Sequence, residues 1–258
     1  MTLIQYMYDP HVDDCIEAKK GREAYPRSND QNELLLLTSN FYQSLAPLVK
    51  DRFNQTDLSY ANAYPIWEYV NSELIYNPNI NFAAFNLSSP EVMEMLSRMA
   101  YIYRTSLMYS KYDTARSVEG YILASRVREK LEHMLKPKYT PRLQIEFGPP
   151  ETFLSYFGIN KLSNVFHLSI PKSASSMVCE LVTTAPGTDI PSKKEINMRF
   201  LYHDAPSMTN PTQLQAYPLF QKPLIEIPWD EFKKESTLSN QGCDDMVSQL
   251  WEHEWEVR

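Results

Sequence analysis

The stretch "RLQIEFGPPETFLSYFGI", residues 142–159, decides the fold because its periodicity changes halfway along. Residues 142–147 alternate between polar and apolar side chains, which is typical of a short strand. Residues 150–159 are typical of a short helix, and the glycine and prolines between them indicate a tight turn. The sequence therefore predicts a strand, a turn and a helix at this point.

The half of the chain before this stretch is predicted to be helical. Apolar residues recur at spacings of three and four in the segments 29–53, 66–77, 88–110 and 117–135. Ser89 and Pro90 are a typical helix start, and Pro137 ends the last of these helices. The residues predicted to face inward are Leu34, Leu37, Phe41, Leu45, Val49, Ile66, Tyr69, Val70, Leu74, Val92, Leu96, Met99, Ile102, Tyr103, Val118, Ile122, Val127, Leu131 and Met134.

After this stretch, two β-rich runs at 174–184 and 195–203 flank the turn-forming segment "PGTDIPSKK" and predict an antiparallel pair. A last short helix follows Pro228. We therefore expect an α/β fold: a sheet with antiparallel edge strands and a mostly helical insert or cap. The expected divisions are a helical region at 1–138, an α/β core at 139–240, and a tail or docking segment at 241–258.

The composition excludes several classes of function. The hydrophobic content of 43% and charged content of 22% are those of a soluble globular protein. The net charge of −7 argues against nucleic-acid binding. No apolar run approaches the roughly 20 residues that span a bilayer. Neither GxGxxG nor GxxxxGK[ST] is present, so we expect no nucleotide cofactor bound in these ways.

Four stretches resemble, in their order, parts of the histidine acid phosphatase family. They are "YDTARSVEGYILASRVREKLEHML", "RLQIEFGPPETFLSYFGI", "IPKSASSMVCELV", and the segment from "NMRFLYHDA" to "IPWDEFKKE". The resemblance implies a histidine-phosphatase-like sheet, here incomplete. In this family a histidine in an N-terminal RHGxRxP motif attacks phosphorus, and a His-Asp pair after the central strand donates a proton. No Arg-His-Gly occurs in this sequence, and the chain resembles the part of the domain that follows that motif.

The proton-donor turn of the family also departs from its pattern here. When Gly148 and Thr152 are matched to the family's turn, Pro149 and Pro150 replace the His-Asp pair. A gapless match instead places Glu146 and Phe147 there. Glu151 could supply a substitute acid, or it could simply favour the positive end of the following helix. The resemblance therefore implies a degenerate acid-donor turn at Pro149, Pro150 and Glu151, and no catalytic residue.

Residues 203–204 hold a His-Asp pair in "FLYHDAP", but at the end of the later antiparallel strand. In that register the pair should face solvent, away from the pocket. We interpret His203 and Asp204 as turn residues before Pro206.

Other chemically capable residues carry no clear pattern. His11, Asp13, Asp14 and Cys15 form one cluster without a second at matching spacing, so we expect no metal site. Ser173, Ser175 and Ser176 show no His or Asp partners. The three cysteines, Cys15, Cys179 and Cys243, are interpreted as reduced thiols.

The C-terminal segment "WEHEWEVR" contains His253 between glutamates but no HExxH motif. Trp251 and Trp255 are four residues apart, which places them on one face of a short helix. This aromatic pair either packs against the chain itself or contacts a neighbouring protein.

We expect a non-catalytic phosphatase-like protein that serves as a structural or interaction subunit of a larger assembly. If the family's first strands are missing, the strand Arg142–Phe147 has an unpaired edge, and another polypeptide would cover it. One alternative is the C-terminal chain of a two-chain acid phosphatase acting on phosphate monoesters. Another is an anion-binding module without turnover. The cysteines and the lack of a visible signal segment lean toward an intracellular, organellar (mitochondrial) assembly, with a secretory or lysosomal location as the alternative.

Overall fold

The computed structural model shows a protein of mixed helix and sheet. Contacts divide it into two compact units. Unit 1 comprises residues 1–19, 108–166 and 171–258, and unit 2 comprises residues 20–107 and 167–170. The structure describes residues 5–7, 15–53, 60–77, 89–136, 143, 145–162, 170–172, 174–185, 191–203 and 214–236.

Unit 2 is helical, as its periodicity predicts. Its helices are α2 (Asn29–Phe53), α3 (Ala63–Tyr76) and most of α4 (Pro90–Met108), with the 3-10 turns η2 (Tyr25–Arg27) and η3 (Tyr60–Asn62); α1 (Ile16–Ala24) crosses the boundary between the units along the chain. Leu45, Val49, Ile66, Val70 and Leu96 are buried, as expected from their spacing.

The predicted inward face fails at two helix positions in unit 2. Leu37 on α2 is 77% exposed, and Leu74 near the end of α3 is 46% exposed. On α2 the buried stripe begins instead at Tyr42, whose hydroxyl donates a hydrogen bond to the Tyr60 carbonyl over 3.2 Å. The spacing therefore identified the helices correctly, but it extended their buried faces too far toward one end.

Unit 1 contains a four-stranded antiparallel sheet with β4 at its centre. Strand β4 (Ile196–His203) pairs with β3 (Ser176–Thr183) on one side and with β5 (Gln215–Tyr217) and β6 (Glu226–Pro228) on the other. This confirms the expected antiparallel pair, with bounds within two residues of the predicted 174–184 and 195–203. Glu180 stands directly opposite Arg199 in the β3–β4 register.

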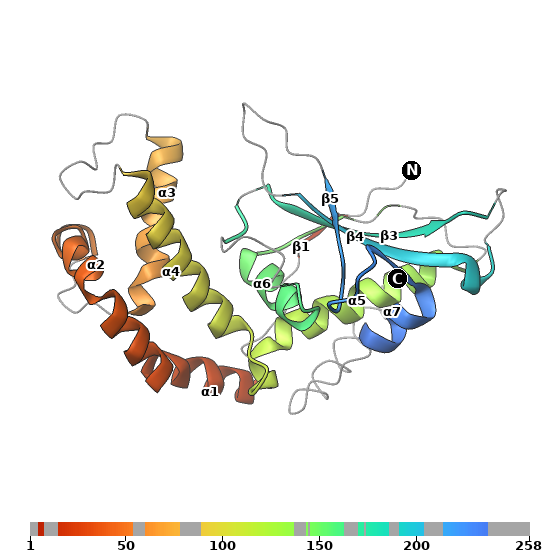
Figure 1. The fold of residues 1–258 in the computed structure, drawn as a ribbon, viewed down its shortest axis with the longest axis horizontal. Helices are drawn as coiled ribbons and strands as arrows, with labels where there is room; N and C mark the ends of the chain where they lie inside the picture. The colour runs from red at the N-terminus through yellow and green to blue at the C-terminus, as the bar shows by residue number, and fades with distance from the viewer. Residues whose placement is uncertain are drawn as a thin grey trace. The chain divides into compact units, whose positions relative to one another are not determined.

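One face of this sheet is covered by helices α5 (Val118–Met134), α6 (Pro150–Ile159) and α7 (Trp229–Ser236) (Figure 1). Alternate residues of β4 are buried under them, because successive side chains of a strand point to opposite faces. The apolar core contains Ile196, Met198, Phe200 and Tyr202 from β4, Tyr156 and Phe157 from α6, and Trp229 and Phe232 from α7. Helix α5 therefore belongs to unit 1, although the sequence suggested a boundary at residue 138.

Helices α5 and α6 cross at very short range, and Gly120 makes this possible. A Cβ atom at Gly120 would lie 2.6 Å from the backbone carbon of Ser155. The Gly120 N–H donates a hydrogen bond to Ser155 Oγ over 2.9 Å, and Ser155 Oγ donates one to the Ser117 carbonyl over 3.1 Å. Ser155 and Ser117 are both buried, so these bonds satisfy polar groups that water cannot reach.

A second, two-stranded sheet contains the strand that the sequence places at 142–147. Within this range the structure describes the strand β2 (Ile145–Phe147), which pairs in parallel with β1 (Gln5–Met7). One edge of this strand is thus paired within the chain, and the expectation that another polypeptide covers an unpaired edge stays a prediction. Among the described residues, β1 is the one strand that pairs with β2.

Candidate functional site

The turn after β2 holds the candidate residues Pro149, Pro150 and Glu151. Gly148 and Pro149 are exposed, and α6 begins at Pro150. The extended backbone of Pro149 (φ −72°, ψ 157°) leads into the helix, and its carbonyl accepts a hydrogen bond from the Thr152 N–H over 3.3 Å. Proline fits the first helical position because its ring fixes φ near the helical value and its missing N–H is not needed there.

The chemistry of this turn is limited to one ionisable group. Neither Pro149 nor Pro150 has a side-chain proton to transfer. Glu151 lies half-buried in the first turn of α6, where a carboxylate is stabilised by the positive end of the helix dipole. Glu151 also takes part in a further polar interaction. Its position therefore fits the structural role considered above at least as well as a catalytic one.

A buried polar cluster lies directly behind the turn. The Thr152 hydroxyl on α6 donates a hydrogen bond to Glu119 on α5 over 3.4 Å, and both residues are buried. Together with Ser155 and Gly120, these groups attach the first turns of the two helices to each other. The cluster fixes where α6 begins, and so it fixes the conformation of the turn that precedes α6.

The strand leading into the turn carries an exposed apolar strip. Leu143, Ile145 and Phe147 alternate along the chain, and their side chains are 41%, 37% and 53% exposed. Ile145 and Phe147 stand at alternate positions of β2 and so share one face, and Leu143 precedes the strand. Parallel sheets are found almost always with both faces covered, so an open apolar face on a parallel pair is unusual. We call these three residues the β2 strip.

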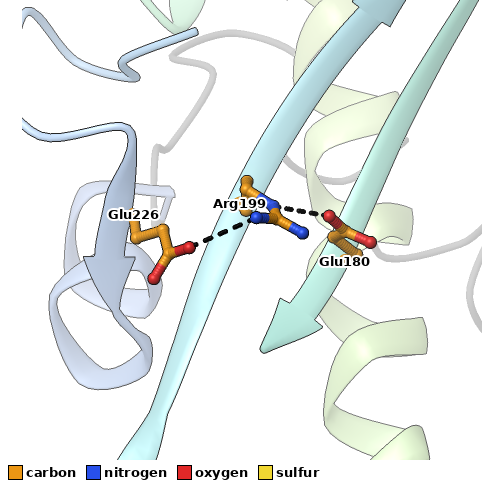
Figure 2. Close-up of polar contacts among 3 residues, drawn as sticks. All are labelled: Glu180, Arg199 and Glu226. Atoms are coloured by element: carbon orange, nitrogen blue, oxygen red, sulfur yellow. Dashed lines mark hydrogen bonds and ion pairs between the residues drawn. The ribbon is translucent and has the colours of Figure 1, made fainter. Parts of the chain in front are cut away.

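The outer face of the four-stranded sheet carries an ion cluster that joins three strands. Figure 2 shows the guanidinium of Arg199 on β4 between Glu180 on β3 and Glu226 on β6. Arg199 Nε lies 2.6 Å from Glu180 Oε1, and Arg199 Nη1 lies 3.4 Å from Glu226 Oε1. Each side chain is about one-third exposed, so the cluster aligns the strands more than it stabilises them.

His203 is the last residue of β4 and stands opposite Ser176 of β3. It alternates with the buried residues Phe200 and Tyr202, so it shares the outer face with Arg199. Helix α6 packs on the other face. The structure therefore does not bring His203 together with the turn at residues 148–151, and Asp204 lies outside the described residues.

The remaining sequence candidates divide into described and undescribed residues. Among the described residues, no group of three or more His, Cys, Asp or Glu side chains could hold a metal ion. Ser175 and Ser176 lie at the start of β3 on the sheet. The other candidates lie outside the described residues: His11, Asp13, Asp14, Ser173, Trp251, His253 and Trp255.

In the described part of the chain, every helix is either too short or too polar to cross a bilayer.

The interpretation of all cysteines as reduced thiols is wrong for Cys15, which is disulfide-bonded. The odd number of cysteines gave the wrong indication, because an odd set can still contain one bonded pair. Cys179 is free, and its sulfur lies 3.7 Å from the Tyr156 hydroxyl in the core of unit 1. Burial raises the pKa of the Cys179 thiol to about 12, so this thiol is protonated and unreactive near neutral pH.

Two features of the site were missed in the sequence. The β2 strip could have been found from the alternation of residues 143, 145 and 147, but alternation does not say whether a face is covered. Predicting the Arg199 cluster required the register between β3 and β4, which their long connection leaves open.

No family model matches the chain, and no curated protein matches it either. The resemblance to histidine acid phosphatases therefore rests on the quoted residues.

Proposed function

We propose that this chain is a non-catalytic, histidine-acid-phosphatase-like protein that serves as a structural or interaction subunit of a larger assembly. The observation that supports this most directly is the β2 strip, whose apolar side chains Leu143, Ile145 and Phe147 are open to solvent. The strip leads into the turn at which the resemblance would require a proton donor and the sequence has Pro149 and Pro150.

The energetics of the β2 strip favour a covered state. Fully burying a Leu, Ile or Phe side chain contributes about 1.5–3 kcal/mol, and each residue of the strip is already partly buried. Covering all three side chains would therefore contribute a few kcal/mol to association. This corresponds to a change of roughly 100-fold or more in a dissociation constant. The proposed occupant is another polypeptide that also lies along the edge of β2 opposite β1, where no described residue pairs with the strand.

Substitutions on the β2 strip test this proposal in the native assembly. Ile145→Asp and Phe147→Asp should release the chain from the assembly in size-exclusion chromatography, because a charged group cannot be buried there without a partner. The released chain should remain folded, since both side chains are at least partly exposed. Tyr112→Asp is the matched control, because Tyr112 is an exposed aromatic residue outside the strip.

The same preparations distinguish the alternatives that the sequence leaves open. Under the proposal, Glu151→Gln leaves the rate at which the assembly hydrolyses p-nitrophenyl phosphate at acid pH unchanged. A robust activity that falls at least 100-fold in Glu151→Gln would instead identify Glu151 as the acid of a two-chain phosphatase. Assembly that survives both strip substitutions would exclude the β2 strip as the contact.

A further inference from the structure

The turn between β5 and β6 has an unusual backbone. Phe220 and Gln221 have φ values of 55° and 59°, which lie in the left-handed region. The Lys222 N–H donates a hydrogen bond to the Leu219 carbonyl over 2.9 Å and closes the turn. Residues with a side chain disfavour this conformation because Cβ crowds the neighbouring carbonyl oxygen, and turns of this kind normally use Asn-Gly or Asp-Gly. The turn at residues 219–222 is therefore strained.

Contacts with helix α7 hold the turn in this conformation. Phe220 is buried, and the centre of its ring lies 6.2 Å from that of Phe232 on α7. Lys222 Nζ lies 2.8 Å from Glu231 Oε1 and 3.5 Å from Glu235 Oε1, both on the same helix. A strained backbone persists only where its surroundings hold it in place. The conformation of the turn is thus coupled to the packing of α7.

One hydrogen bond also joins the turn to the end of α6. The Phe220 N–H donates to the carbonyl of Asn160 over 2.9 Å, and Asn160 is the buried C-cap residue of α6. The Asn160 Nδ2 donates in turn to the Tyr156 carbonyl over 2.8 Å. If the turn relaxes, the Phe220 amide loses its acceptor. This amide therefore reports whether the turn is in its strained conformation.

The packed state of α7 has an unfavourable term of its own. Trp229 begins the helix and is 0% exposed, and its indole N–H finds no acceptor among the described residues. A buried donor without an acceptor is destabilising because it has lost its hydrogen bond to water. Helix α7 has eight residues, which is too short for a helix to be stable by itself. Apolar burial against β4 and α5 must therefore outweigh both the strain and the unpaired indole.

We propose that residues 219–222 and α7 form a strained latch, which opens as one unit before the rest of unit 1 unfolds. Opening relaxes Phe220 and Gln221, separates Lys222 from its two glutamates, and lets water accept the Trp229 N–H. It also uncovers part of the apolar face of β4, on which α7 packs. The latch contains neither the β2 strip nor the turn at residues 148–151, so this inference is independent of the proposed function.

Native-state hydrogen exchange of the chain tests whether the latch opens separately. The Phe220 amide and the hydrogen-bonded amides of α7 should exchange through one shared opening. This opening should be populated at least 10-fold more than the opening that exposes the paired amides of β3 and β4. Exchange of the Phe220 and α7 amides no faster than those of β3 and β4 would overturn the proposal, because the latch would then open only when the whole unit unfolds.

Gln221→Gly tests the strain. The Gln221 side chain is exposed, so the substitution removes no core contact. Glycine accepts the left-handed conformation, so exchange of the Phe220 and α7 amides should slow by about 3–10-fold. Leu224→Gly is the matched control, because Leu224 is exposed and its φ is not positive, and it should not slow this exchange. Unchanged or faster exchange in Gln221→Gly, or slowing in both variants, would contradict the proposal.

Lys222→Met tests the coupling between the turn and α7. Loss of both ion pairs should speed exchange of the Phe220 and α7 amides by about 2–5-fold, and added salt should narrow the difference from wild type, because the pairs are partly exposed. Lys234→Met makes the same change of charge at an exposed position of α7 and should leave the exchange as it is. Wild-type exchange in Lys222→Met would contradict the coupling.

Discussion

Strands β4 and β2 carry similar apolar side chains at alternate positions, yet their environments are opposite. In β4, Met198 and Phe200 are fully buried under α5, α6 and α7. In β2, Ile145 and Phe147 are 37% and 53% exposed. The two strands differ in what covers them. Helices α5, α6 and α7 pack over the apolar face of β4, whereas β1 supplies β2 with a neighbouring strand at one edge but leaves the β2 strip open.

The difference shows that alternation predicts a strand but not its burial. A half-apolar strand is stable only when its apolar face meets another layer. For β4 that layer belongs to unit 1 itself. For β2 the described part of the chain leaves the strip exposed, and this is the physical reason for proposing a partner. The comparison can be tested by changing one residue on each strand, then the layer that covers β4, then the sheet face opposite that layer.

The largest effect is expected when the same substitution is made on both strands. Phe200→Ala should lower the free energy of unfolding by about 3–5 kcal/mol, because it leaves a cavity among Tyr156, Phe157 and the sheet. Phe147→Ala should lower it by about 1 kcal/mol or less, since half of this side chain is already in water. Urea unfolding of the isolated chain measures both. Equal losses would show that the two faces do not differ.

A smaller effect is expected from Gly120→Ala, which disturbs the layer over β4. In an unhindered helix, alanine is more stable than glycine by about 1 kcal/mol. Here the new methyl group would meet the Ser155 backbone, which cannot rotate away, so we expect a net loss of about 1–3 kcal/mol. The sign of the change in urea unfolding is therefore the test. A stabilised variant would mean that α5 and α6 can separate without cost.

The smallest effect is expected on the outer face of the sheet. Arg199→Met should lower the free energy of unfolding by about 0.2–1 kcal/mol, and added salt should reduce the difference, because the ion cluster is partly exposed. Lys194→Met makes the same change of charge at an exposed position beside β4 and serves as the control. A loss of several kcal/mol that salt does not reduce would indicate that this face is covered as well.

Local sequence signals were sufficient for the helices and for the antiparallel pair. Spacings of three and four identified α2 to α5, and the turn-forming segment between β3 and β4 predicted their pairing. Other features depend on contacts between residues far apart in sequence, such as the β1–β2 pairing. The turn at Phe220 and Gln221 was also hidden, because both residues adopt positive φ without being glycine or asparagine.

The residues of the candidate site could be named from the sequence, but their surroundings could not be predicted from it. The residues at the turn, Pro149, Pro150 and Glu151, could be named from the quoted stretch alone. Placing His203 on the face of the sheet opposite α6 required knowing which alternate residues of β4 are buried. The sequence alone left the register of this strand unknown. Predicting that the β2 strip is exposed required the positions of all the surrounding elements. No local sequence pattern contains these positions.

The pairing of Gln5 with Ile145 also sets an order of events during synthesis. A ribosome adds roughly 5–20 residues per second, so β1 emerges about 7–28 s before β2 is available to bind it. During that interval residues 20–107 of unit 2 are made and can begin to fold, while the N-terminal strand has no neighbour to pair with. Closing such a distant contact is slow, so the parallel pair should form among the last events of maturation.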